Sequence, residues 1–426
     1  MTLTRRKILQ MIPAATAMAM MPGVKAALPH RVVVVGGGFA GASVAKYIKM
    51  WSNGAIDVTL VEPRLQHVSC IMSNLVLNNR LTTKDLSFDY VALQGKYGVR
   101  VIQDRAVRVS GAGSEVKLKE AGWLPYDSLV LAAGIKFDPV EGLDSRKTPH
   151  AWIAGSQTNL LRNQIRKMPD NGTFVMTIPR SPYRCPPGPY ERACLVADTL
   201  KRRGGAPRVI VLDANSDIQA EKETFSRAFT QLYGDIIEYR PGVRLEAVDS
   251  VGRYAYTVRE SDGVEETVYG DVLNVIPGHS APSLLTRSGL TNGERWAPVD
   301  PISYESTLPG FRNVYVIGDS QGTGQPKSGH MANSQAKVCA DAITRRAAGL
   351  PVDTAERLAN ITTNSACFSP ITATEASWLT AVFRYNVDTR AMGLVGGSLG
   401  EARRWNSENF RDMFSWSENL FADTFS

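Results

Sequence analysis

The sequence predicts an α/β fold, with two strand–helix–strand domains and a smaller C-terminal α+β domain. A β-branched run over residues 31–35 ends in a glycine-rich turn, and helical spacing follows over residues 42–50. A second unit of the same kind has a strand over residues 173–178 and a helix over residues 191–203. A chain of 426 residues is long enough for two or three such domains.

The N-terminal residues 1–26 have the composition of an export signal. A basic start with Arg5 and Arg6 precedes an apolar segment over residues 8–21, and small residues follow up to Ala26. The paired arginines resemble the twin-arginine signal, which exports folded proteins. The apolar segment is shorter than a membrane span and contains a proline. We therefore expect a cleaved signal, a periplasmic protein and no membrane span in the mature chain; a membrane anchor is the alternative.

The charge of the chain gives no indication of a nucleic-acid partner. The full sequence has 48 Lys and Arg against 41 Asp and Glu, a net charge of +7. Loss of residues 1–26 removes four basic residues and no acidic one, which leaves +3. Such a small excess is not the footprint of a nucleic-acid-binding surface.

The first glycine-rich turn has the spacing of a dinucleotide site. Gly36 permits a tight turn, Gly38 lets the backbone approach a pyrophosphate, and Gly41 lets the helix pack on the strand. Glu62 lies 21 residues after Gly41, where a carboxylate can accept a hydrogen bond from a ribose hydroxyl. The candidate binding residues of this turn are Gly36, Gly38, Phe39, Ala40, Gly41, Glu62 and Pro63.

A second segment favours FAD over NAD as the dinucleotide. Residues 307–319 contain a strand over residues 313–317 that ends at Gly318 and Asp319. This segment resembles the second FAD fingerprint of flavoproteins with two dinucleotide-type domains, in which the Asp binds the ribityl chain. Asp319 as a simple helix cap is the alternative. The further candidate FAD contacts are Ala133, Gly134, Gly318, Asp319 and Lys327.

The order of these segments predicts the domain boundaries. Residues 27–150 and 280–350 are expected to form one discontinuous FAD domain, residues 151–279 a second Rossmann-like domain, and residues 351–426 a C-terminal interface domain. The shorter strands are expected in two groups. These are a β-meander of residues 99–109, 115–119 and 128–132, and a hairpin of residues 254–259 and 265–269.

The second unit has no glycine pattern at its first strand-to-helix turn. Users of NAD(P)H need glycine there, because only glycine lets a pyrophosphate approach the backbone closely. This chain instead has prolines between residues 179 and 189, with Cys185 at the tip of the turn. We infer that a nicotinamide cofactor is not the partner and that a sulfur group occupies this exposed position.

The chain has five cysteines, an odd number for an exported protein in which disulfides can persist. At least one sulfur must be free, bonded to another molecule, or attached to a group other than cysteine. Cys194 and Cys339 lie on apolar faces of predicted helices and are expected to be buried free thiols.

The surroundings of Cys70, Cys185 and Cys367 resemble the flavoprotein subunit of flavocytochrome c sulfide dehydrogenase, over nearly the whole mature chain. The resemblance implies a glutathione-reductase-like fold and a thioether between Cys70 and the flavin. It also implies a redox disulfide of Cys185 and Cys367 beside the flavin ring, with Glu191 as a catalytic acidic residue nearby. The alternatives are an unattached Cys70 in the core, a purely structural disulfide, and a Glu191 placed only by the helix dipole.

The same resemblance implies an oxidoreductase that oxidises sulfide, a small inorganic substrate, and passes electrons to a c-type cytochrome. The chain has no Cys-x-x-Cys-His haem motif, so the cytochrome is expected as a separate subunit. A sulfide:quinone oxidoreductase and a non-catalytic flavoprotein binding module are the alternatives. The aromatic tail over residues 403–425 carries acidic side chains that an anionic membrane surface would repel. We expect it to pack on its own domains.

Overall fold

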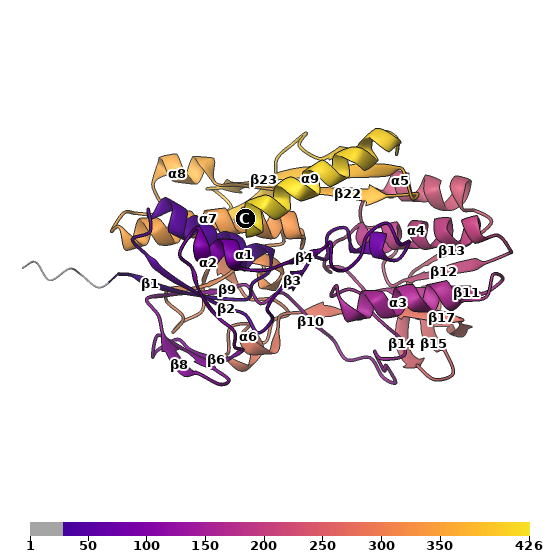
Figure 1. The fold of residues 1–426 in the computed structure, drawn as a ribbon, viewed down its shortest axis with the longest axis horizontal. Coiled ribbons are helices and arrows are strands. Elements are labelled where there is room, and N and C mark those ends of the chain that lie inside the picture. Colours follow the sequence, from indigo (N-terminus) through magenta and orange to yellow (C-terminus); the bar gives the residue numbers. More distant parts are fainter. Residues whose placement is uncertain (1–28) are drawn as a thin grey trace, which may run out of the picture.

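The computed structural model describes residues 29–426, so the expected export signal lies outside the described part. Figure 1 shows an elongated molecule with one α/β unit at each end, and a C-terminal layer that lies along both. The predicted α/β fold is confirmed. Among residues 29–426, no helix is both long and apolar enough to cross a membrane.

The first unit is built on a seven-stranded sheet with β1 near its centre. The strand order is β19-β20-β21-β9-β1-β2-β5. β1 pairs in parallel with β2 and β9, and β21 joins β9 in parallel from a distant part of the chain. The bounds are β1 Arg31–Val35, β2 Asp57–Val61, β5 Arg100–Ile102, β9 Ser128–Leu131, β19 Val299–Asp300, β20 Glu305–Ser306 and β21 Val314–Val316.

Two helices, α1 (Phe39–Trp51) and α7 (Gly329–Ala347), cover one face of this sheet and pack on each other. Alanines such as Ala42 and Ala336 in both helices allow this close approach, and both are fully buried. The other face carries a β-meander and a short helix. These are β6 Ala106–Ser110, β7 Glu115–Leu118, β8 Gly122–Pro125 and α6 Ser283–Arg287.

The meander differs from its prediction. Residues 100–102 and 128–131 belong to the large sheet as β5 and β9, and the meander proper is β6-β7-β8. All these strands are short, so a local pattern of alternation does not distinguish a strand of the large sheet from a strand of the meander. Strand pairing over long sequence distances decided the assignment.

The second unit is a four-stranded parallel sheet in the order β13-β12-β11-β17. Helices α3 and α4 pack on one face, and the three-stranded sheet β14-β15-β16 packs on the other. The predicted hairpin is confirmed as β15 and β16. The bounds are α3 Ser156–Lys167, β11 Thr173–Ile178, α4 Gly188–Arg203, β12 Arg208–Asp213, α5 Lys222–Arg227, β13 Ile237–Pro241, β14 Val243–Asp249, β15 Tyr254–Arg259, β16 Glu265–Tyr269 and β17 Val272–Val275.

The C-terminal layer connects the two units. Its strand β22 bonds to the first unit through Ser365 and Ser328, and to the second through Ser369 and Glu221. In Figure 1 this layer runs above both units. Its elements are α8 Ala355–Asn360, β22 Thr362–Pro370, β23 Ala376–Asn386, β24 Ala391–Leu394, β25 Gly400–Glu401 and α9 Ser407–Phe425.

The aromatic tail forms helix α9, which packs on the first unit as expected. Phe425 stacks on Phe88, with ring centroids 4.9 Å apart, and lies 5.6 Å from the ring of Phe39. The remaining short elements are β3 His67–Val68, β4 Ser87–Phe88, α2 Val91–Gly95, β10 Lys136–Phe137 and β18 His279–Ser280, with single helical turns at Ser73–Val76, Ala228–Leu232 and Gly318–Ser320.

Candidate active site

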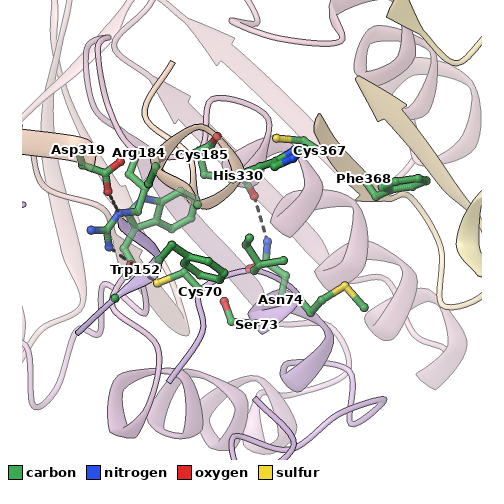
Figure 2. Close-up of a pocket in the computed structure, with 18 of the residues that line it drawn as sticks. Cys70, Ser73, Asn74, Trp152, Arg184, Cys185, Asp319, His330, Cys367 and Phe368 are labelled. Carbon is green, nitrogen blue, oxygen red and sulfur yellow. Dashed lines mark hydrogen bonds and ion pairs between the residues drawn. The ribbon is translucent and has the colours of Figure 1, made fainter. Parts of the chain in front are cut away.

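A cavity lies where the first unit, the second unit and the C-terminal layer meet. It contains about 1180 Å³ of space that no protein atom fills, part of it open to solvent. Figure 2 shows Asp319, Arg184 and Cys70 on one side of the view and Cys367 and Phe368 on the other. Segments far apart in the sequence therefore supply one site.

The glycine-rich turn between β1 and α1 forms one wall of the cavity. Gly36 has a φ of +101°, and a Cβ there would stand 2.5 Å from the carbonyl oxygen of Ala132. A Cβ on Gly41 would stand 1.7 Å from the carbonyl oxygen of Gly36. Neither position can hold a side chain, so the strand and the helix approach each other directly. Gly38, Phe39 and Ala40 line the cavity at the N-terminus of α1.

Glu62 stabilises this turn from the end of β2. Its carboxylate accepts hydrogen bonds from the backbone N–H of Gly37, at 2.8 Å, and of Arg64, at 3.1 Å. The side chain is buried, with 3% of its surface exposed, and lies outside the lining of the cavity, as does Pro63. In this structure the carboxylate therefore supports the loop.

The second fingerprint forms the adjoining wall. Gly318 has a φ of +71° and lines the cavity together with Asp319 and Gly134. One carboxylate oxygen of Asp319 accepts a hydrogen bond from Nε of Arg184 at 2.6 Å, and the other is buried without a partner. Such an unsatisfied oxygen is available to a hydroxyl of a bound ligand. Ala133 stands beside Gly134 but outside the lining.

Lys327 does not line the cavity. Its ammonium donates hydrogen bonds to the carbonyl oxygens of Asp319 and Gln321, both at 2.9 Å, and lies 3.7 Å from the centre of the Trp296 ring. Burial lowers the pKa of Lys327 to about 8. Lys327, which we expected to contact the cofactor, instead supports the loop of the second fingerprint through its hydrogen bonds.

The residues present fit a bound FAD. The N-termini of α1 and α7 both reach the cavity, and oriented backbone N–H groups there favour phosphate oxygens. The apolar lining suits a flavin ring, and the free oxygen of Asp319 suits a ribityl hydroxyl. His67 also faces this wall, with both ring nitrogens buried and unpartnered. Burial lowers the pKa of His67 to about 3, so the ring is neutral.

Three cysteines surround the cavity: Cys70, Cys185 and Cys367. All three are half-buried, and the Cys185–Cys367 disulfide stays a prediction. Cys194 and Cys339 are fully buried free thiols in α4 and α7, as expected.

Cys70 lies beside Arg184, whose side chain is largely buried. Its sulfur accepts a hydrogen bond from Arg184 at 3.8 Å and donates one to the carbonyl oxygen of Trp152 at 3.5 Å. Arg184 comes from the proline-rich turn of the second unit and pairs with Asp319 of the first. It thus connects Cys70 to the second fingerprint, as Figure 2 shows.

Cys185 is held in an unusual backbone conformation at the tip of the turn before α4. Its φ of +57° lies in the left-handed region, which non-glycine residues seldom adopt. Its N–H donates to the carbonyl oxygen of Lys327 at 2.7 Å. Its sulfur lies against Gly188, where a Cβ would stand only 2.8 Å away. The sequence predicts an exposed position for Cys185, and this prediction is wrong, because the residue is half-buried.

The two cavity thiols Cys185 and Cys367 both resist ionisation. Burial raises the pKa of Cys185 well above its usual range, and the nearby Cys367 adds to this. Burial also raises the pKa of Cys367 to about 12, with a further contribution from the charge of Glu221. The thiolates are therefore costly in this environment, and an oxidised pair is the form that a nucleophile would attack.

Glu191 lies in the first turn of α4 and lines the same cavity. Burial raises its pKa to about 8, although a hydrogen bond from Asn74, at 3.0 Å, favours the carboxylate. The adjacent Arg192 is 1% exposed and donates to Asn74 and Asn274, both at 2.9 Å. At neutral pH the Glu191 carboxyl is largely protonated.

Sequence reasoning missed four residues of the site, which are His67, Asn74, Arg184 and Arg192. The sequence analysis singled out the segments that contain these residues because of their cysteines or prolines. No spacing rule predicts that an arginine or an amide in such a segment will be buried in a site. The adjacency of Arg184 and Arg192 to Cys185 and Glu191 was the available signal.

The position for a nicotinamide ribose in the second unit is filled by side chains. Asp213 ends β12, the place where dinucleotide-binding units carry the ribose-binding carboxylate. Here Asp213 is 0% exposed and accepts hydrogen bonds from the hydroxyls of Tyr190, at 2.8 Å, and Tyr239, at 2.9 Å. A cofactor would have to displace both rings.

Comparison with known proteins agrees with this geometry. Residues 30–164 match the family model of pyridine nucleotide-disulphide oxidoreductases. Residues 158–277 match the model of the central part of the sulfide dehydrogenase (flavocytochrome c) flavoprotein chain. Residues 30–277 therefore resemble the flavoprotein oxidoreductases that these two models describe. The expected sulfide dehydrogenase subunit is matched over residues 158–277.

Three similar proteins, two compared by sequence and one by structure, are informative. The mitochondrial sulfide:quinone oxidoreductase of Dictyostelium discoideum is 23% identical over 84% of this chain and 78% of its own. The sulfide dehydrogenase (flavocytochrome c) flavoprotein chain of Chlorobaculum thiosulfatiphilum is 59% identical over 46 residues, which are 11% of this chain and 94% of that sequence. The solved sulfide:quinone oxidoreductase of Aquifex aeolicus superposes with a TM-score of 0.76 at 16% identity, covering 93% of this chain and 92% of that one.

Proposed function

We propose that this flavoprotein is a sulfide dehydrogenase subunit that oxidises sulfide through a Cys185–Cys367 disulfide and FAD. The observation that carries the proposal is the presence of both sulfurs on the wall of the cavity that also holds the two FAD fingerprints. The match of residues 158–277 to the sulfide dehydrogenase family supports it.

The proposed reaction begins with attack of hydrosulfide on one sulfur of the disulfide. A new S–S bond forms as a cysteine persulfide, the old bond breaks, and its electron pair stays on the other cysteine as a thiolate. Bound FAD supplies a two-electron acceptor beside this pair. A second nucleophile then takes the sulfane sulfur and leaves both cysteines reduced, and their return to the disulfide gives up the two electrons that the acceptor would take.

The charged groups of the cavity favour an incoming anion at neutral pH. Glu191 is largely protonated there, because burial raises its pKa to about 8. Arg192 lines the cavity and carries positive charge, whereas the charge of Arg184 is matched by that of Asp319. An approaching hydrosulfide therefore meets one excess cation and a neutral carboxyl.

We propose a separate c-type cytochrome as the electron acceptor. We also propose that residues 1–26 direct export of the chain, so that the reaction takes place in the periplasm. A quinone is the second candidate, because sulfide:quinone oxidoreductases are similar over most of the chain. The burial of Phe410, Phe421 and Phe425 of α9 against the chain itself favours the cytochrome, because these side chains are not available to a bilayer. Sulfide-reduced protein should reduce a soluble c-type cytochrome faster than a short-chain quinone; the reverse order would favour the quinone.

The cysteine mechanism is tested by anaerobic titration with sulfide while the flavin absorbance is followed. The Cys185→Ser and Cys367→Ser variants should stay yellow and should not be bleached by sulfide. Cys194→Ser and Cys339→Ser are matched controls outside the cavity, and should be bleached as in the wild type. Near-normal bleaching of either cavity variant would overturn the mechanism, and a wild-type flavin that sulfide cannot reduce would favour a non-catalytic binding module.

The thioether is a separate part of the proposal. We propose that Cys70 attaches to the flavin, because its half-buried sulfur faces the cavity beside Arg184 and Asp319. Acid precipitation should leave the flavin in the pellet of the wild type and of Cys194→Ser, and release it from Cys70→Ser. Flavin released from the wild type would show that the attachment is absent.

A further inference from the structure

A second buried carboxyl, Glu221, lies behind the cavity. It precedes helix α5, has a φ of +49° and is 0% exposed. One carboxylate oxygen accepts a hydrogen bond from the hydroxyl of Ser369 at 2.5 Å, and the other oxygen is buried without a partner. Acidic side chains are almost never fully buried without a functional or structural partner.

The strand β22 places Glu221 in the environment of Cys367. Alternate residues of a strand point to the same side, so Ser365, Cys367 and Ser369 share one face. Ser369 bonds to Glu221, and Ser365 bonds to Ser328 of the first unit at 3.0 Å. Cys367 therefore lies between two buried hydroxyls, and the charge of Glu221 raises the pKa of its thiol.

Two buried carboxyls thus act on the sulfurs of the cavity pair. Glu191 acts on both Cys185 and Cys367, whereas Glu221 acts on Cys367. The two carboxyls come from different segments of the second unit, the first turn of α4 and the residue before α5.

We propose that Glu221 takes up a proton from solvent when Cys367 acquires negative charge in the opening of the disulfide, and releases it when the electron pair moves on. The charge on Cys367 is that of a thiolate, or of a persulfide anion if this sulfur is the one attacked. The added proton keeps the total charge of the buried pair constant. The proposal rests on the proposed function and assigns Glu221 as a positioning residue that acts through its charge and Ser369.

The surroundings of Glu221 permit such a change of protonation. Burial raises its pKa to about 7, the hydrogen bond from Ser369 opposes this, and the charge of Glu401 adds to it. Glu401 is exposed on β25, and its carboxylate interacts with the backbone of Glu221. The other described groups that face it are Ser377 on β23, opposite Ser369, and Glu191, Cys194 and Cys367.

The first test needs no sulfide. The reduced holoprotein is treated with iodoacetamide at pH 6 and pH 9, and the alkylation rates of Cys367 and Cys185 are measured by peptide mass spectrometry. At pH 9 we expect roughly three- to ten-fold faster alkylation of Cys367 in Glu221→Gln than in the wild type, since a lost negative charge lowers the pKa of a neighbouring thiol. At pH 6 the two proteins should alkylate Cys367 at nearly the same rate, because wild-type Glu221 is then protonated. Glu223→Gln, an exposed neighbour on α5, is the control.

The pH dependence separates this role from a structural one. A disturbed fold would change the alkylation rate of Cys367 equally at both pH values. Glu221→Asp, which keeps the carboxyl, should alkylate Cys367 at the wild-type rate at both. An equal change at both pH values, or none, would overturn the pairing of Glu221 with Cys367.

The second test measures the rate of flavin bleaching between pH 6 and pH 9, divided by the concentration of hydrosulfide at each pH, because hydrogen sulfide itself ionises in this range. The wild type and Glu223→Gln should show a pH-dependent step near pH 7 that Glu221→Gln lacks. An unchanged profile in Glu221→Gln would overturn the proton uptake. If sulfide does not bleach the wild type at all, the proposed function fails and the proton uptake fails with it, whereas the alkylation ratio still reports whether the carboxyl acts on Cys367.

Discussion

Arg184 is the single residue that joins most parts of the site. Its guanidinium contacts Asp319 at 2.6 Å and Cys70 at 3.8 Å, and only 17% of its side chain is exposed. Its backbone N–H donates to His279 at 2.9 Å. A charge of the second unit therefore neutralises a carboxylate of the FAD loop.

Arg184→Met should lower the free energy of unfolding by about 3 kcal/mol, because it leaves the buried carboxylate of Asp319 unpaired. FAD should also dissociate faster if it is not covalently attached. The matched control is Arg180→Met, whose ion pair with Glu260 is largely exposed, and which should change stability by less than about 1 kcal/mol. Urea unfolding of the two variants checks this, and equal effects would contradict the role of the Arg184 pair.

The raised pKa of Glu191 predicts that the rate of reaction with sulfide depends on pH. Its pKa of about 8 means that the carboxyl is neutral below pH 8 and ionised above it. The rate of flavin bleaching should therefore fall as the pH rises through about 8, because the carboxylate repels hydrosulfide. Glu191→Gln should retain its rate above pH 8. A rate that instead rises through pH 8, and is lost in the variant, would show that the ionised carboxylate acts as a base.

At the scale of elements, helix α9 links the C-terminal layer to the glycine-rich turn. Phe425 and Phe421 lie against Phe39, which belongs to that turn, with ring centroids 5.6 and 6.1 Å away. The same helix lines the cavity with Met413 and Trp416. The tail is therefore part of the cofactor site.

Phe425→Ala should destabilise the protein by about 3 kcal/mol, the usual cost of a cavity left by a buried aromatic ring. It should also speed the loss of non-covalent FAD, because Phe39 loses its support. Phe414→Ala on the same helix is the control, since its ring is half-buried and contacts Phe410. Thermal unfolding and flavin fluorescence measure both effects; an unchanged FAD release in Phe425→Ala would separate α9 from the cofactor site.

At the scale of the whole molecule, the site exists only where the two α/β units and the C-terminal layer meet. The first unit supplies the FAD loops, the second unit supplies Cys185 and Glu191, and the C-terminal layer supplies Cys367. The fold is that of an enzyme with two dinucleotide sites, but the second site holds tyrosines around Asp213.

NADH should therefore fail to bleach the flavin under anaerobic conditions in which sulfide bleaches it. Tyr190 and Tyr239 would have to leave Asp213, which is fully buried, before a ribose could reach it. Tyr190→Phe should not restore the reaction, because the ring remains in place. Bleaching of the wild type by NADH at a comparable rate would contradict this use of the second unit.

Much of the fold could be predicted from local patterns. The glycine spacing at residues 36–41 identifies a turn whose backbone admits no side chains, and the hairpin of β15 and β16 was correctly placed. The helix expected from residue 191 begins at Gly188, because a proline at position 189 is compatible with a first helical turn. The predicted strands of the meander were wrong, because pairing between distant strands decided which short segments joined the large sheet.

The sequence by itself determined the α/β units, the FAD fingerprints and the candidate cysteines, because each of these depends on residue types at short spacing. Only the tertiary structure decided that Cys70, Cys185 and Cys367 surround one cavity and that Arg184 pairs with Asp319. It also decided that Glu191 and Glu221 are buried carboxyls with raised pKa values. Burial and long-range contact set these properties, since the free energy of a charge depends on what the whole fold places around it.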